Sequence, residues 1–570
     1  MKVVGYKAAA GAALLALALA ACGGGSDKPA AGTAEGAKAA QEQAAALPGS
    51  ATNPVAYDQV KDGGTITLAL SQWHQQWNYN QVNGTHADVS DVYDAIMPSI
   101  YEANDKAELV NNPDFVTEWK LELKGDKQVV TYKLNDKATW SDGTPITYKD
   151  YVAQWKALNG SDDKFQVSST DGYDRVESVE KGATDHDVVV TFSKQYPDWQ
   201  GMFSPLAPAS TNSDATAFNK SWIDKIPVTA GPFKVEKMDQ TTKTITLVRD
   251  DKWWGQKAKL DKVIFRALDS GATVNAFANG ELDAMEIAPS AADLKRAKAV
   301  ADVDIRKAAA PNWRHLTVNG SAPNLTDKSV RQAVLLGINR EAITQSDLKD
   351  LDWPVQVLNN HLYMNTHKGY VDNSGELGTY NPEKAKQLLD AAGWKMQGEY
   401  RAKDGKELEL RFIVPATLPL AKQEGELTQA MLKDVGVRVK IVPVPDDKFF
   451  DDYVTPGNFD LVPFSWIGTP FPNGALPQIY KQPTSKDNFG SNFPRIGSPE
   501  LDTLIEQAAG EMDPAKYIEL GNQADKLIWD EVHTIPLYQR PSIFATKKTL
   551  ANYGAFGFAT KDWSAVGFTK

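Results

Sequence analysis

One stretch decides the expected fold: Ala138-Thr139-Trp140-Ser141-Asp142-Gly143-Thr144-Pro145, followed by Tyr148-Lys149-Asp150-Tyr151-Val152. Thr147 precedes Asp150 by three residues, which is the capping-box spacing that predicts the start of a helix. Upstream, Val129–Leu134 is rich in β-branched and aromatic residues and ends at a turn-forming Asn-Asp pair, so it predicts a strand. The stretch therefore predicts a strand, a polar loop and a capped helix.

The same alternation of strand and helix signals continues along the chain. Two further strands are predicted at Thr65–Leu70 and Asp187–Phe192. Helices are predicted where a capping residue precedes a proline and an apolar face follows, at Asn381-Pro382, Ser498-Pro499 and Asp513-Pro514. This pattern favours a mixed α/β fold over a sandwich or a helical bundle.

Together these motifs resemble the family 5 extracellular solute-binding proteins, the receptors of ABC importers for oligopeptides, dipeptides and nickel. The decisive stretch, with Tyr132-Lys133-Leu134 before it, is similar to the signature segment of that family. Further similar segments follow in the same order: Thr229–Val235, Phe277–Asp283, Asp327–Ile343, Tyr380–Trp394 and Ile535–Gln539. The resemblance extends over nearly the whole chain after residue 60.

The resemblance implies a two-lobed, type II periplasmic-binding-protein-like α/β fold with discontinuous lobes and an additional insert subdomain. Lobe I is expected at 60–97, 219–312 and 535–570, the insert at 98–218, and lobe II at 313–534. Two crossings, near Asn312-Trp313-Arg314 and His533-Thr534-Ile535, are expected to act as hinges for closure around a ligand.

The N-terminus resembles a lipoprotein leader. Lys2 and Lys7 precede an apolar run that is too short for a comfortable membrane span, and the run ends in Leu19-Ala20-Ala21-Cys22, which resembles a bacterial lipobox. Residues 1–21 are expected to be a signal peptide, and Cys22 the site of lipid attachment. Residues 22–59 are expected to form a lipidated, disordered tether on the extracytoplasmic face of the cell membrane, plausibly at a Gram-positive cell surface.

Composition narrows the choice of partners. The chain has 570 residues and a formal charge of −12, which removal of Lys2 and Lys7 makes more acidic, so nucleic acid is not expected as a partner. A 42% hydrophobic content over this length predicts more than one hydrophobic core. The expected partners are a short peptide and an ABC permease complex, with the receptor itself a monomer.

Five candidate ligand-binding residues lie in two segments. Trp73 and Trp77 follow the first predicted strand, where a ligand wall and structural packing are about equally expected. Asn312, Trp313 and Arg314 lie at the first expected crossing. Arg314 has the geometry to hold a ligand carboxylate in a bidentate pair, with an inter-lobe ion pair as the alternative.

Two more candidates lie in a segment similar to the one that supplies an acid for the ligand's ammonium group in the family. Trp466 is expected to stack on the ligand, so Trp466→Ala should weaken binding by about 1–3 kcal/mol with little change in melting temperature. Thr469 stands where the family has the acid. A salt bridge to a free N-terminus is therefore not expected at that position.

Metal and catalytic sites are not expected. Seven histidines are scattered, none in an i, i+4 pair, and only His361 and His367 share a loop. No nucleophile elbow or phosphate-binding glycine loop is present in the sequence, so no cofactor and no enzymatic activity are expected. The alternatives to a peptide receptor are a tethered hydrolase with a carboxylate pair, or the same fold binding a sugar, an opine or a metal chelate.

Overall fold

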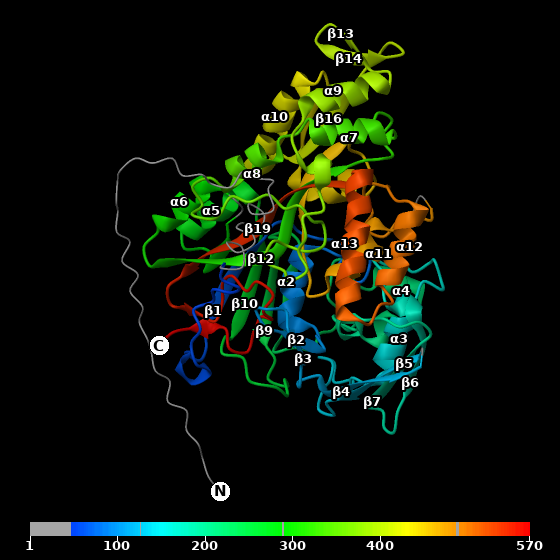
Figure 1. Ribbon diagram of the computed structural model, residues 1–570. Helices are drawn as coiled ribbons and strands as arrows, with labels where there is room; N and C mark the ends of the chain where they lie inside the picture. The colour runs from blue at the N-terminus through cyan, green and yellow to red at the C-terminus, as the bar shows by residue number, and fades with distance from the viewer. Residues whose placement is uncertain (1–46, 126, 288–289, 486–488) are drawn as a thin grey trace, which may run out of the picture.

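The computed structural model describes residues 47–125, 127–287, 290–485 and 489–570 (Figure 1). The predictions for the leader, for Cys22 and for most of the tether lie outside these residues. Within these ranges no helix is long and apolar enough to cross a membrane. We use the names lobe I, insert and lobe II for the three residue sets defined above.

Lobe I contains a four-stranded sheet. Its first strand, β1 (Thr65–Leu70), matches the predicted strand and turns Ile66, Leu68 and Leu70 into the core. β1 pairs in parallel with its neighbour, and the remaining pairs are antiparallel. The strand order is β1, β10 (Lys262–Ala267), β9 (Thr244–Arg249) and β8 (Phe233–Asp239).

The insert has its own antiparallel sheet, and the decisive stretch lies beside it. The capping box is confirmed at the start of α3 (Tyr148–Leu158), where the Thr147 backbone N–H donates to Asp150 Oδ2 at 2.9 Å. The predicted strands at 129–134 and 187–192 are confirmed as well. The sheet order is β4 (Val116–Lys124), β5 (Lys127–Leu134), β7 (Asp187–Phe192) and β6 (Val176–Lys181). Smaller elements are β2 (Tyr101–Ala103), β3 (Leu109–Asn111) and α4 (Ala215–Lys220).

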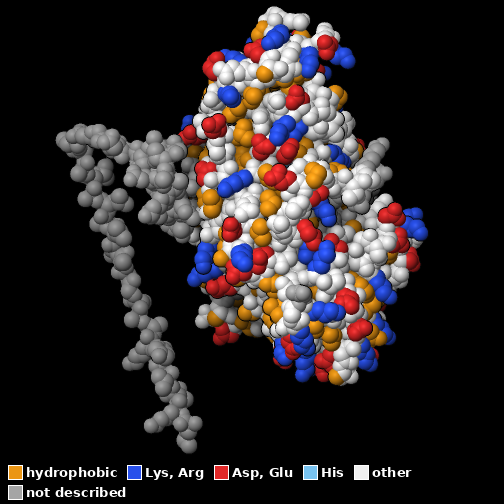
Figure 2. Space-filling view, turned by 45° about the vertical axis from the view of Figure 1, so that its right-hand side comes forward, with side chains coloured by type: hydrophobic (Ala, Val, Ile, Leu, Met, Phe, Trp, Pro, Cys, Tyr) orange, Lys and Arg blue, Asp and Glu red, His pale blue; other side chains and the backbone are white. Residues whose placement is uncertain are grey.

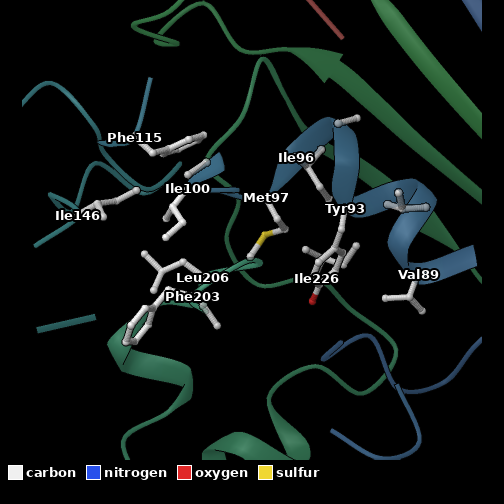
Figure 3. Close-up of a cluster of buried hydrophobic side chains, with 14 of the residues drawn as sticks. Val89, Tyr93, Ile96, Met97, Ile100, Phe115, Ile146, Phe203, Leu206 and Ile226 are labelled. Atoms are coloured by element: carbon white, nitrogen blue, oxygen red, sulfur yellow. The ribbon is translucent and has the colours of Figure 1, made fainter. Parts of the chain in front are cut away.

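Helix α2 (Ala87–Ile96) packs lobe I against the insert. Val89, Tyr93 and Ile96 lie on one helical face, and Figure 3 shows this face among apolar side chains that follow the helix, come from the insert or, for Ile226, belong to lobe I. The labelled partners are Met97, Ile100, Phe115, Ile146, Phe203, Leu206 and Ile226. The opposite face of α2 carries the exposed Asp91 and Asp94.

A six-stranded sheet connects the two lobes. Its two longest strands, β12 (Val303–Val318) and β19 (Thr534–Lys547), pair antiparallel over almost their whole length. The lobe I half of β19 also pairs with β11 (Ala284–Glu286). The lobe II half of β12 pairs with the next strand of the sheet, beyond which the remaining strands follow. The strand order is β11, β19, β12, β18 (Leu461–Trp466), β16 (Glu409–Pro415) and β17 (Arg438–Val444).

The pairing of β12 with β19 changes one expected position. The register shifts between Ala309 and Trp313, at the first expected crossing. Because Ala309 pairs with Pro541 and Trp313 with Gln539, the opposite point on β19 lies at residues 539–541. The second crossing, expected near His533-Thr534-Ile535, stays a prediction, and the strand register favours a position about six residues further along the chain, since antiparallel partners lie side by side.

Helices cover the lobe II part of the sheet. The three proline-marked helices begin as predicted, with the side chains of Asn381, Ser498 and Asp513 accepting backbone N–H bonds at their N-caps. The helices of this region and its border with lobe I are α5 (Ser270–Ala278), α6 (Ala291–Lys298), α7 (Lys328–Leu336), α8 (Arg340–Leu348), α9 (Pro382–Ala391), α10 (Pro419–Asp434), α11 (Ala475–Tyr480), α12 (Pro499–Ala508) and α13 (Pro514–Glu531). The small strands are β13 (Lys395–Gln397), β14 (Tyr400–Lys403), β15 (Lys406–Glu407), β20 (Leu550–Ala551) and β21 (Gly567–Phe568). In Figure 1, α12 and α13 descend from lobe II to the insert.

The folded part of the chain begins earlier than expected. A tether was expected up to residue 59, but Ala51 forms an antiparallel bridge with Ala555. Val55 N–H donates to Asn552 Oδ1 at 2.8 Å, and Asn552 Nδ2 donates back to Val55 O at 3.0 Å. The physical reason is that the C-terminal segment offers a backbone edge and an amide side chain that pair with residues 51–55.

Charges of both signs are distributed over the visible surface. Figure 2 shows Lys and Arg side chains interspersed with Asp and Glu side chains over both lobes, with hydrophobic side chains scattered between them. Mixed charge of this kind is typical of a water-exposed protein face.

Candidate ligand-binding site

Aromatic side chains of lobe I and the insert meet aromatic side chains of lobe II. The His86 ring lies 5.5 Å from Phe450, which belongs to the π-helical turn η7 (Phe449–Val454). The Tyr101 ring lies 6.0 Å from Phe471, edge to face. These contacts place His86 and Tyr101, which follow β1 in the chain, opposite Phe450 and Phe471, which flank β18. The segment after β1 and the segment around β18, both expected to contribute ligand-binding residues, therefore face one another.

A third contact lies near the crossing strands. The His367 ring of lobe II lies 5.0 Å from Phe558 of lobe I. The Met364 backbone N–H donates to His367 Nδ1, so the proton of the neutral ring is on Nε2, and burial lowers the pKa of His367 to about 4. His367 is therefore neutral near pH 7 and contributes an uncharged ring to the inter-lobe interface.

The two predicted tryptophans after β1 lie in different environments. Trp77 is fully buried in the core of lobe I and the insert, whereas Trp73 is only partly buried. Their rings meet edge to face at 5.7 Å. Of the two expectations for this loop, structural packing describes Trp77, and only Trp73 has side-chain surface to offer a ligand in this conformation.

Trp466 lies between two other rings. It stacks on Phe493 at 5.7 Å with an interplanar angle of 3°, and on His315 at 6.0 Å with an angle of 5°. Two protein rings therefore already pack against the indole, which is half-buried, while the neighbouring Trp313 is buried. Ligand stacking by Trp466 stays a prediction, and because of these packing contacts Trp466→Ala should lower the melting temperature as well.

Arg314 is engaged inside lobe II. Its Nε and Nη2 atoms donate to the two carboxylate oxygens of Glu424 at 2.7 and 2.6 Å, and Glu424, on α10, is fully buried. The pair is bidentate, as expected of arginine, but it is neither a ligand contact nor an inter-lobe ion pair. The reason is strand alternation, which turns Arg314 away from the side of β12 that carries Trp313.

A second acid lies beside this ion pair. Burial, followed by the negative charge of Glu424, raises the pKa of Asp347 to about 9, so Asp347 keeps its proton near pH 7. Beneath α10 the positive charge of Arg314 is therefore neutralised by the negative charge of Glu424, and Asp347 adds no further charge.

Thr469 and Asn312 lie close together at the crossing. Gly468, next to Thr469, lies against the backbone of Pro311, where an added Cβ would come within 2.3 Å of the Pro311 carbonyl oxygen. Thr469 is exposed, and its hydroxyl accepts the Phe471 backbone N–H at 3.2 Å. Asn312 Oδ1 is buried without a hydrogen-bond partner. Thr469 thus shapes a turn in lobe II, beside the strand that crosses into lobe I.

Two aspartates of the insert, which the sequence analysis missed, face the same turn. A Cβ at Gly474 would lie 3.5 Å from Asp198 Oδ2 and 3.8 Å from Asp171 Oδ2. Asp171 accepts the hydroxyl of Tyr196 at 2.8 Å, and Asp198 accepts the hydroxyl of Tyr517 from lobe II at 2.7 Å. Nothing in the sequence distinguished these two carboxylates from the other acidic residues, because only the fold brings them opposite lobe II.

Burial changes the protonation of these two carboxyl groups. It raises the pKa of Asp171 to about 8 and that of Asp198 to about 7. No ion pair involves either group among the residues that the structure describes. The insert therefore presents two acids to lobe II that have no ion-pair partner among the described residues, although the charge of Arg175 acts on Asp171.

Lys561 is the cation nearest to the acidic face of α2. It pairs with Asp91 at 2.6 Å and with Asp94 at 2.8 Å. Burial, only partly offset by Lys561, raises the pKa of Asp94, although its side chain keeps 39% of its surface exposed. Lys561 thus forms ion pairs with both carboxylates.

His361 and His367, the two histidines considered as a candidate metal site, make contacts with different parts of the protein. His361 is buried, with Nδ1 2.6 Å from Asp525 and Nε2 3.2 Å from the Thr534 carbonyl oxygen. Both of its nitrogens are therefore occupied, while His367 faces Phe558. Among the described residues, no three His, Cys, Asp or Glu side chains are arranged to hold a metal ion.

A chain built from two lobes with strands crossing between them, and with aromatic and acidic side chains facing across the interface, has the architecture of a solute-binding receptor. The comparisons with known proteins agree. Residues 111–488 match the family described as bacterial extracellular solute-binding proteins, family 5 Middle. The chain belongs to this family.

Two curated relatives and two solved structures define the similarity further. The chain is 38% identical over 515 residues to the oligopeptide-binding protein OppA of Mycobacterium tuberculosis, covering 90% of this chain and 86% of the relative. It is 26% identical over 441 residues to the oligopeptide-binding protein AppA of Bacillus subtilis, covering 74% and 77%.

Among solved structures, the periplasmic EDTA-binding protein EppA superposes with a TM-score of 0.78 at 27% identity, covering 91% of this chain and 98% of that one. AppA from Bacillus subtilis in complex with a nonapeptide also gives 0.78, at 21% identity, covering 90% and 100%. The type II two-lobed fold expected from the sequence is confirmed.

The Arg314 pair generates a first prediction. Glu424→Gln should lower the free energy of unfolding by about 1–3 kcal/mol, because the buried guanidinium loses its bidentate partner and Asp347, once free of the charge of Glu424, ionises as a less well placed counter-charge. Glu426→Gln on the same helix is the matched control, since Glu426 is 57% exposed and its pair with Lys422 spans 3.6 Å. The control should change stability by less than about 0.5 kcal/mol. Urea unfolding measures both, and equal small effects would contradict the assigned role.

The insert acids generate a second prediction. The native-state pKa of Asp198, about 7, lies above its ordinary value of 3.8, so the native protein binds more protons than the unfolded chain. Its stabilising contribution is full below about pH 4 and is lost as the pH rises through 7. The part of the free energy of unfolding that depends on Asp198 should therefore fall between about pH 4 and pH 7 and level off above pH 7, and Asp198→Asn should flatten that fall. A wild-type slope retained in Asp198→Asn would contradict this assignment, and Asp530→Asn is the exposed control.

Proposed function

We propose that this chain is a lipid-anchored, extracytoplasmic receptor of an ABC importer that binds short peptides between its lobes and delivers them to a permease. The observation that carries the proposal is the 38% identity to an oligopeptide-binding protein over 90% of the chain. Binding rather than catalysis is the proposed activity, and the receptor acts as a monomer.

The side chains between the lobes support a ligand with positive groups. Asp171 and Asp198 face lobe II and have no ion-pair partner among the described residues. A peptide brings an ammonium group and main-chain donors, which such acids accept. Since Thr469 has no charge, these two acids of the insert would take that role.

A second candidate ligand follows from the similarity to the EDTA-binding protein EppA. A polyanionic chelate beside Asp171 and Asp198 would favour the protonated forms of these two groups, so it would gain no charge pairing from them. A ligand ammonium would instead favour their ionised forms and pair with them, which favours the peptide over the chelate.

The anchor completes the proposal. Lipid on Cys22 would hold the receptor at the membrane, and the residues between Cys22 and the folded segment that begins near Ala51 would give it reach. A receptor that passes cargo to a membrane permease gains from this high local concentration.

Mass spectrometry of the purified protein tests the function and the anchor together. The native spectrum of detergent-extracted protein should contain peptide ligands, released intact on denaturation. The denatured chain should lack residues 1–21 and carry the added mass of lipid on Cys22. A sugar or a metal chelate in place of peptide would overturn the ligand assignment, and peptide fragments appearing with time would favour the hydrolase.

The two tryptophans after β1 provide a matched pair of variants. Trp73→Ala should weaken binding of a peptide identified in that spectrum by about 1–2 kcal/mol, because its partly exposed ring loses ligand contact. Trp77→Ala should instead lower the free energy of unfolding by about 3–5 kcal/mol, because Trp77 is fully buried. Calorimetric titration and thermal unfolding separate the two effects. Unchanged affinity in a folded Trp73→Ala protein would remove Trp73 from the site.

A further inference from the structure

The insert and lobe II touch at a second place, where helix α12 reaches the strands of the insert. Glu506 on α12 lies between two cations of the insert. Its Oε2 is 2.8 Å from Arg175 Nη2, and its Oε1 is 2.9 Å from Lys194 Nζ. One carboxylate of lobe II therefore bridges two positive charges across the lobe boundary.

Arg175 depends on lobe II for its environment. Its Nη1 donates to Gln195 O within the insert at 3.1 Å, and its Nη2 donates to the Glu506 carbonyl oxygen at 3.2 Å. The Arg175 side chain keeps only 5% of its surface exposed, and an added Cβ at Gly510 would lie 3.4 Å from Nη1. Separation of α12 from the insert would return this guanidinium to water.

A second link lies deeper in the same contact. The Tyr517 hydroxyl on α13 donates to Asp198 Oδ2 at 2.7 Å and accepts the Asn473 backbone N–H at 3.1 Å. Phe471 packs on Gly201 so closely that a Cβ there would come within 2.6 Å of its ring. Tyr517 and Phe471 thus hold the turn of lobe II against the insert.

Water reaches the outer link. A groove of about 700 Å³ runs along it, lined by charged side chains that include Arg175, Lys194, Glu506 and Lys516. Glu506 keeps 53% of its side-chain surface exposed. A half-exposed ion pair contributes little free energy, typically about 1 kcal/mol or less, so this link opens readily.

We propose that Glu506 with Arg175 and Lys194, and Tyr517 with Asp198, form a latch that holds the two lobes closed by protein contacts alone. Apart from Asp198, none of its residues is among those proposed to hold a ligand. The latch rests on the two-lobed receptor of the proposed function, but it does not depend on the ligand being a peptide.

The latch has a defined role in binding. A ligand closes a receptor only by the difference between its affinities for the closed and open states. A latch that raises the population of the closed state before binding lowers the free energy that the ligand must supply. Because the latch contributes little free energy, the lobes can still open and release the ligand.

The test measures lobe separation in ligand-free protein. Spin labels are placed on the full chain with Cys22→Ser, at Leu123→Cys in the insert and Met396→Cys in lobe II, both about half exposed. Bound ligand is removed by unfolding and refolding. Pulsed electron–electron double resonance then gives the distribution of distances between the two labels.

Glu506→Gln should raise the ratio of open to closed molecules by about threefold to fivefold, and Tyr517→Phe should add to this effect. Asp530→Asn is the matched control, because Asp530 is 52% exposed and pairs with Lys328 within lobe II. The control should keep the wild-type distribution. Equal distributions in wild type, Glu506→Gln and the double variant would overturn the latch.

A ligand-binding measurement separates this result from the proposed function. The peptide released from the purified protein should dissociate several-fold faster from Glu506→Gln than from wild type. If no peptide binds but the distances still shift, the latch stands and the peptide assignment fails. If peptide binds and neither distance nor dissociation rate changes, the latch fails and the receptor stands.

Discussion

The antiparallel pairing of β12 with β19 is the constraint on which the rest of the molecule depends. The two strands run through both lobes, so each backbone hydrogen bond between them ties the lobes into one sheet. Register shifts between Ala309 and Trp313 and between Arg314 and His315 interrupt this ladder. A break in the ladder removes backbone pairing where bending must occur, whereas the regular pairing on each side keeps both lobes rigid.

Strand alternation then decides the role of each side chain along the crossing. Trp313 lies on the side of β12 that meets Trp466, while its neighbour Arg314 lies beneath α10 against Glu424. His315 returns to the first side and covers one face of Trp466. Adjacent residues at the crossing thus belong to an aromatic stack and a buried ion pair, although the sequence presents them as one cluster.

Local signals in the sequence predicted the elements well, because capping and alternation are encoded by near neighbours. The strand Thr65–Leu70 and the helix capped by Thr147 needed no tertiary information. The site was harder to predict, since its residues meet only after folding. Glu424 is 110 residues from Arg314, and Tyr517 is 319 residues from Asp198. The position of the second crossing depends in the same way on strand register, which a sequence motif does not contain.

The distribution of charge between the lobes explains why closure remains reversible. The bidentate ion pair of Arg314 with Glu424 lies wholly within lobe II and is buried, so it stabilises the lobe rather than the interface. The pairs that span the boundary use the half-exposed Glu506, where water competes for the carboxylate and for Lys194. Asp198, which lies deeper, gains a hydrogen bond from Tyr517 but no counter-charge. A receptor built this way holds its lobes rigid with buried charge and joins them with weak contacts, so that ligand binding decides between the open and closed states.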